Sequence, residues 1–193
     1  MADAKGRDVN EALIYVTGYA GIAPVEQTNV ITEAQLSSPT MTVPTAYKYL
    51  GLRTSDGGPE QSREAGEALE FLEDGFVINT DGSITVAMTL AQYNAVTREL
   101  SLGSAPDANG VIKVKDTTPS NQHILLLEST YKSGAIKREH GVARISEITN
   151  GKDERGTVNG IAATFTWVRS ELFDNSYYWE AYIEDTAEAP ETP

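Results

Sequence analysis

The stretch Ser83-Ile-Thr-Val-Ala-Met-Thr-Leu90 indicates the fold class most clearly. Its large apolar side chains stand at alternate positions, namely Ile84, Val86, Met88 and Leu90. A period of two is typical of a β-strand that buries one face. The dipeptide Asp81-Gly82 comes directly before it and favours a hairpin turn. We therefore expect a strand over residues 83–90, entered through a turn.

The pattern changes immediately after this strand. Over residues 91–100, Tyr93, Val96 and Leu100 recur at spacings of three and four, which is typical of a short amphipathic helix. Gly103 follows and can adopt the left-handed conformation that ends many helices. The sequence thus predicts one short helix beside the strand.

Further strands are expected on both sides of this unit. The first covers residues 12–20, and the later ones cover residues 111–115, 124–127, 135–149, 157–168 and 177–183. Turn signals separate several of them, including Ser133-Gly134 and Asn150-Gly151. Many short strands with such spacing indicate a mainly β (α+β) domain, built as a sandwich or barrel with one flanking helix. We expect residues 1–183 to form this single domain.

Two segments carry little periodicity. Residues 22–58 contain prolines and no sustained pattern, and loops of this length are uncommon unless they bind something. Residues 59–74 are acidic: seven acids and one base fall between Asp56 and Asp74, which suits either a solvated helix or a strand that begins near Ala68. The last ten residues, 184–193, contain four acids and no base, and we expect a flexible acidic tail.

Composition excludes several kinds of chemistry. The chain has 193 residues, a formal net charge of −13, no cysteine and two histidines, His123 and His140. Thiolate chemistry is therefore absent, a histidine-rich metal site is excluded, and the negative charge disfavours binding to nucleic acid. We find no catalytic or nucleotide-binding motif and predict no enzyme activity, no cofactor and no metal. The acids Glu67 and Glu70 could serve a glycosidase, but a solvated acidic face explains them more simply.

The chain is expected to be a soluble cytosolic product. No apolar run approaches the roughly 20 residues that a membrane-spanning helix needs. The polar first ten residues do not resemble a secretory signal.

Two stretches resemble the major tail tube proteins of long-tailed, non-contractile bacteriophages (siphophages). In Thr45–Gly58, the positions typical of that family are held by Tyr47, Leu50, Gly51, Ser55, Asp56 and Gly57. In residues 84–102, a strand passes into a helix whose start carries Gln92, Asn94 and Val96, as in the family. The motifs are short, and their order along residues 9–183 carries the resemblance.

The resemblance implies a virion structural protein. Family members form hexameric rings that stack into a hollow tube, surround a tape-measure protein, and meet terminator and distal tail proteins at the tube ends. DNA passes through without specific binding, and no membrane is involved. The chain would be made in the host cytoplasm and end in the phage tail. An acidic lumen would let the phosphate backbone slide, because like charges repel.

Candidate contact residues follow from the same resemblance. The 22–58 segment would be the loop that contacts the next ring, aided by extended terminal arms, through Tyr47, Tyr49, Leu50, Leu52 and Asp56. The aromatic residues Trp167, Tyr178 and Trp179 are expected in the core or between subunits, because aromatic side chains dominate both kinds of packing. The alternatives are another tail or baseplate component, a secretion-system tube protein, and a surface or carbohydrate-binding β-sandwich.

Overall fold

The computed structural model describes residues 12–70, 75–114 and 122–184. The fold is mainly antiparallel β-structure, as predicted, with an eight-stranded sheet, a two-stranded sheet and two short α-helices. The elements in chain order are β1 (Tyr15–Ala23), η2 (Gln27–Asn29), α1 (Glu33–Leu36), β2 (Lys48–Tyr49), β3 (Glu60–Glu64), β4 (Ala68–Glu70), β5 (Val77–Asn79), β6 (Ser83–Leu90), α2 (Ala95–Leu102), β7 (Gln122–Tyr131), β8 (Ile136–Asn150), β9 (Ile161–Val168), η3 (Glu171–Phe173) and β10 (Trp179–Ile183).

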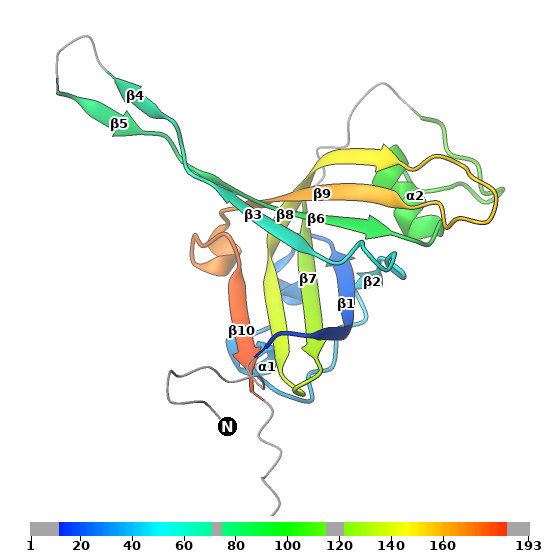
Figure 1. The fold of residues 1–193 in the computed structure, drawn as a ribbon, viewed down its shortest axis with the longest axis horizontal. Helices are drawn as coiled ribbons and strands as arrows, with labels where there is room; N and C mark the ends of the chain where they lie inside the picture. Colours follow the sequence, from blue (N-terminus) through cyan, green and yellow to red (C-terminus); the bar gives the residue numbers. More distant parts are fainter. Residues whose placement is uncertain (1–11, 71–74, 115–121, 185–193) are drawn as a thin grey trace, which may run out of the picture.

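The long strand β8 joins two layers. The large sheet has the order β2-β1-β7-β8-β9-β6-β3, and β10 also pairs with β8. One edge of β8 pairs with β7, while its other edge is shared, with residues 136–140 against β10 and residues 142–150 against β9. Figure 1 shows β6 and β9 running across β1 and β7. The sheet therefore folds over itself as a sandwich, with β8 common to both layers.

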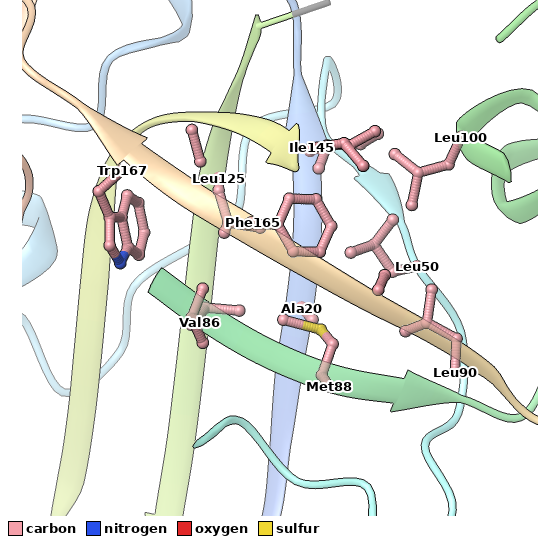
Figure 2. Close-up of a cluster of buried hydrophobic side chains, with 14 of the residues drawn as sticks. Ala20, Leu50, Val86, Met88, Leu90, Leu100, Leu125, Ile145, Phe165 and Trp167 are labelled. Carbon is pink, nitrogen blue, oxygen red and sulfur yellow. The ribbon is translucent and has the colours of Figure 1, made fainter. Parts of the chain in front are cut away.

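The main hydrophobic cluster lies between these layers. Figure 2 shows Ala20 and Leu125 from one layer with Val86, Met88 and Phe165 from the other. The alternation predicted for residues 83–90 is confirmed, because all four apolar positions of β6 are buried and the intervening ones are less so. The same holds in β9, whose buried residues are Ile161, Ala163, Phe165 and Trp167.

A second hydrophobic cluster covers the outer face of β7 and β8. Residues 24–50, which we call the strap, contribute Ile31, Leu36 and Tyr47 to it. Because consecutive residues of a strand point to opposite faces, Leu125 and Leu127 of β7 enter the main cluster, whereas Ile124 and Leu126 enter the second. The buried strand predicted for residues 124–127 is confirmed, and its continuous apolar run reflects burial on both faces.

The predicted helix is present as α2 and begins four residues later than expected. The Asn94 side chain accepts hydrogen bonds from the backbone N–H groups of Val96 and Thr97, at 2.9 and 3.0 Å. These bonds satisfy donors that the helix itself leaves free. Gly103 ends the helix with a positive φ of 77°, as predicted. Leu100 then packs into the main cluster, so α2 closes one end of the sandwich.

Several local predictions are wrong. Residues 111–114 form no strand, and Lys115 lies outside the described residues. Residues 60–64 form the strand β3, paired with β6, so the helix alternative for residues 59–74 is wrong, whereas the alternative of a strand that begins near Ala68 is confirmed by β4, which pairs with β5. Asp81-Gly82 is consequently no hairpin turn, since the chain continues through it from β5 into β6. Asn150-Gly151 opens a loop that runs to Gly160. Residues 185–193 of the predicted tail lie outside the described residues.

Candidate assembly surfaces

The most prominent feature of the molecule is a β-hairpin that leaves the body. We call residues 65–70 and 75–82 the arm. It continues β3 and β6 outward as β4 and β5, and Figure 1 shows it projecting away from both layers. Its register pairs Leu69 with Ile78 and Glu70 with Val77. Nearer the body, the backbone N–H and the hydroxyl of Thr80 both donate to the Glu67 carbonyl at 2.9 Å.

The arm displays apolar side chains to solvent. Four of them are more than half exposed: Leu69, Phe76, Val77 and Ile78. Leu69 and Ile78 are directly opposed, and alternation places Phe76 on the same face as Ile78. A two-stranded hairpin is at best marginally stable in water, because it has no second layer to cover its apolar face. The arm is therefore a surface that another molecule could cover.

Glycines form the narrow neck where the arm leaves the body. A Cβ added to Gly66 would lie 1.6 Å from the Thr80 carbonyl oxygen, and one added to Gly82 would lie 2.4 Å from that of Glu64. Both distances are far below van der Waals contact. The two segments of the hairpin can therefore cross this closely only because neither residue has a side chain. The neck geometry thus depends on two residues with no side chain.

An aromatic brace ties the neck to the body. The Tyr177 hydroxyl donates to the Gly82 carbonyl at 3.0 Å. The Arg169 guanidinium lies 4.8 Å from the centroid of the Tyr177 ring, and its Nη2 lies 3.6 Å from Oδ1 of Asp81. The direction of the arm is therefore fixed by contacts as well as by backbone shape.

A second exposed apolar surface lies at the start of β1. We call Leu13, Ile14 and Val16 the apolar ridge; each is more than half exposed. Next to them, Tyr15 is held by Arg53, whose guanidinium donates to the tyrosine hydroxyl and lies 5.5 Å from the ring centroid. The backbone N–H of Lys132 donates to the Ile14 carbonyl at 2.8 Å. The ridge is thus a fixed part of the body with basic residues beside it.

The edge of β1 near the ridge is also open. On one side β1 pairs with β7 along its length, whereas on the other β2 reaches only Gly21 and Ile22 within the described residues. An unpaired edge offers backbone donors and acceptors to an incoming strand. Apolar side chains and an open edge therefore coincide at this end of the molecule.

The predicted inter-ring residues are divided by the structure. Tyr47 and Leu50 are buried, and the Tyr47 hydroxyl donates to the Asn29 carbonyl at 2.8 Å. Their side chains pack within the subunit, and their assignment as contacts between rings stays a prediction. Tyr49 stacks on Tyr19 with ring centroids 5.3 Å apart but remains accessible. The other two candidates, Leu52 and Asp56, are exposed as well.

Residues 24–50 of the predicted 22–58 loop do not reach away from the body. The strap holds buried apolar residues that cover one face of the sheet, so it is part of the body. The extended element is the arm. Sequence reasoning missed Phe76, Val77 and Ile78, although an apolar triplet after Gly75 in an acidic region was an available signal.

The predicted aromatic residues pack mainly within the chain. Trp167 is buried in the main cluster, and the Tyr178 ring lies 5.0 Å from it between centroids. Trp179 contacts Phe173 edge to face at 4.9 Å and remains partly accessible. These aromatics were expected in the core or between subunits. Trp167 lies in the core, whereas Tyr178 and Trp179 are only partly buried.

One cavity of the body is lined by a few titratable side chains. A cavity of about 340 Å³ between α2 and β1 is lined by His123, Lys48 and Glu99 among apolar residues. Lys48 and Glu99 form an ion pair at 3.2 Å, and burial lowers the pKa of His123. Glu67, half of the proposed carboxylate pair, is exposed on the arm. In the described part of the chain, no group of three or more histidine or acidic side chains is arranged to hold a metal ion.

No protein-family model matches the chain, and a search of curated proteins finds no match. Within the described ranges, no helix has both the length and the apolar character required to cross a bilayer.

Proposed function

We propose that this chain is a self-assembling structural subunit, the major tail tube protein of a long-tailed bacteriophage, which forms stacked hexameric rings around a channel for DNA. The observation that carries the proposal is the arm. An isolated subunit leaves four large apolar side chains of the arm in water, and burying them against another copy would recover the hydrophobic free energy that exposure forgoes.

Open strand edges support lateral assembly. In the described part of the sheet, β2 and β3 end the strand order and β10 pairs with β8 alone. The five residues of β3 are all exposed, so its outer edge is accessible. Head-to-tail contacts through such edges can close into a ring by rotation. Residues 45–58 and 84–102 resemble tail tube subunits, which form rings. In a ring, these open strand edges would contact neighbouring subunits.

The charge of the chain supports passage of DNA without specific binding. A net charge of −13 repels phosphate, and the channel would favour sliding if acidic side chains line it. In this proposal a tape-measure protein occupies the channel before DNA does, and terminator and distal tail proteins contact the two ends. The protein has no catalytic role. It is made in the host cytoplasm and functions in the virion.

Negative-stain electron microscopy with sedimentation velocity, across a concentration series, tests the proposal. We expect rings or hollow tubes of the full chain above a threshold concentration. The matched control replaces residues 67–80 with an Asn-Gly turn, which retains the body, and should remain monomeric with an unchanged melting temperature. A full chain that sediments as a monomer at every concentration, as the control does, would contradict self-assembly and favour a monomeric binding module.

The same images separate the related structural alternatives. A tail or baseplate component would give closed assemblies that do not elongate. A tube protein of a secretion system would also give tubes, and antibodies against the purified protein would then label no phage tails in a lysate of induced host cells.

A further inference from the structure

We infer that the arm of one copy docks on the apolar ridge of another copy; this inference rests on the proposed function and names the surface that receives the arm. The starting observation is the distribution of exposed apolar residues. Within the described residues, large exposed hydrophobic side chains form two consecutive runs, residues 13–16 and residues 76–78, and elsewhere they occur singly. Single exposed apolar residues are ordinary, whereas grouped ones mark contact sites, and Leu69, Phe76 and Ile78 share one face of the arm.

The two surfaces cannot cover each other within one chain. Figure 1 shows the arm leaving the body on the side away from the β7–β8 turn, and the start of β1 lies near that turn. The glycine neck and the Tyr177 brace hold the arm in this direction. Among the described residues nothing covers either surface, and a second copy of the chain carries the complementary one.

Charge favours the same pairing. The arm and its base are acidic: Glu67 and Asp81 of the arm are exposed, as is Glu64 at the end of β3. Lys132 is exposed and is tied by its backbone to Ile14, while the Arg53 guanidinium lies over Tyr15 beside the ridge. Opposite charges that flank two apolar surfaces favour the correct register and disfavour arm-to-arm or ridge-to-ridge contacts, in which like charges would meet.

The contact joins two different patches, so it is heterologous. A contact of this kind does not close on two molecules, and each added copy presents a new arm or a new ridge. One arm offers four large exposed apolar side chains, whereas a stable pairwise interface buries roughly 800 Å² on each partner, about 20–30 residues a side. Docking is consequently weak for one pair and becomes strong only where several contacts form together, as between two rings.

Disulfide trapping tests the pairing directly, because the chain contains no native cysteine. Single-cysteine variants are made on the ridge (L13C, I14C and V16C) and on the arm (L69C, F76C and I78C). Each ridge variant is mixed with each arm variant above the assembly threshold and oxidised with diamide. A disulfide needs Cα atoms within about 7 Å, so only docked surfaces are captured efficiently.

We expect at least one ridge–arm mixture to give a covalent dimer in much higher yield than either variant alone. The matched control mixes each arm variant with V158C, because Val158 is as exposed as the ridge residues but lies in the β8–β9 loop. If assemblies form in the microscope and no ridge–arm pair exceeds the V158C control, the docking assignment is overturned while self-assembly stands. If no assemblies form, the proposed function itself fails.

Charge reversal gives a second, independent measurement. K132E should raise the threshold concentration for assembly by about 2- to 5-fold, the range expected for one exposed ion pair. Combining it with E67K should restore the threshold towards that of the unmodified chain. Equal thresholds in all variants, or a double variant that is worse than both singles, would contradict the proposed register of the two charged surfaces.

Discussion

Nε2 of His140 accepts a hydrogen bond from the backbone N–H of Ile31 at 3.0 Å, across 109 residues of sequence. The imidazole is fully buried, with the Phe173 ring 4.9 Å away edge to face and the Tyr47 ring 6.2 Å away. This bond fixes the strap to β8. Since it requires an unprotonated nitrogen, it links the packing of the strap to the charge state of one histidine.

The stability of the body should decrease in acid through His140. Burial lowers the pKa of His140 from 6.5 to about 4, with a smaller opposing contribution from the backbone of Leu125. The unfolded chain therefore binds more protons between these values, so stability is complete above pH 6.5 and decreases as the pH falls towards 4. The loss should be on the order of 3 kcal/mol, measured by urea unfolding at pH 7.0, 5.5 and 4.5.

Two histidine variants distinguish the protonation of His140 from the protonation of aspartate and glutamate side chains. H140N can still accept a hydrogen bond but does not titrate in this range, so the unfolding free energy of this variant should depend less on pH. H123N is the matched control, and its pH profile should stay closer to that of the unmodified protein, because His123 is less buried. Parallel profiles for H140N and the unmodified chain would show that His140 is not the source.

Removing Arg138 should strongly destabilise the body. This buried guanidinium donates to Glu128 Oε2 at 2.7 Å and to the carbonyls of Leu36 and Ser38 at 2.7 and 2.6 Å. R138A leaves these acceptors without a partner in the described structure and should cost about 3–5 kcal/mol in urea unfolding. K152A, which breaks an exposed ion pair with Glu154, should cost less than about 1 kcal/mol. Equal losses of unfolding free energy in the two variants would show that the hydrogen bonds of Arg138 do not stabilise the body.

Alanine at Gly66 should block assembly more than folding. Its Cβ would overlap the Thr80 carbonyl. The two segments that form the neck must therefore separate, and the arm must change direction. We expect the threshold concentration for tubes to rise at least tenfold while the melting temperature of the body changes little. G58A is the control, because a Cβ at Gly58 meets nothing within 4 Å. Normal tubes from G66A would show that arm direction is unimportant.

Loss of the helix cap should have a modest effect. N94A removes the acceptor for the N–H groups of Val96 and Thr97 and should lower the unfolding free energy by about 1 kcal/mol. N94D keeps a carboxylate oxygen at the same place and should stay near the unmodified value. A cost for N94D equal to that for N94A would mean that the side chain acts through something other than capping.

Much of the body could be predicted from the sequence. Strand β6 and the buried face of β9 follow from alternation, because a strand with one buried face repeats every two residues wherever it occurs. The helix α2 and its end at Gly103 follow from spacing and from the conformational freedom of glycine. These patterns are local, so they do not depend on which partner the element meets.

The candidate surfaces could not be predicted in the same way. The strap and the arm both lack clear periodicity, and the sequence interpretation assigned the extended reach to the strap. The strap is instead packed on the sheet through its own Ile31, Leu36 and Tyr47. Its polar partners are His140, 109 residues from Ile31, and Arg138, 102 residues from Leu36. The extended arm results from the pairing of β3 with β6, which excludes a helix and carries the arm beyond the sheet.

The sequence by itself therefore determined a mainly β body, the faces of its most regular strands, one capped helix and an acidic charge. Only the tertiary structure decided which irregular segment is packed and which is exposed. The physical reason is that burial belongs to pairs of surfaces. An apolar residue such as Leu36 is core because β7 and β8 present a face to it, whereas Phe76 is exposed because the described chain presents no such face.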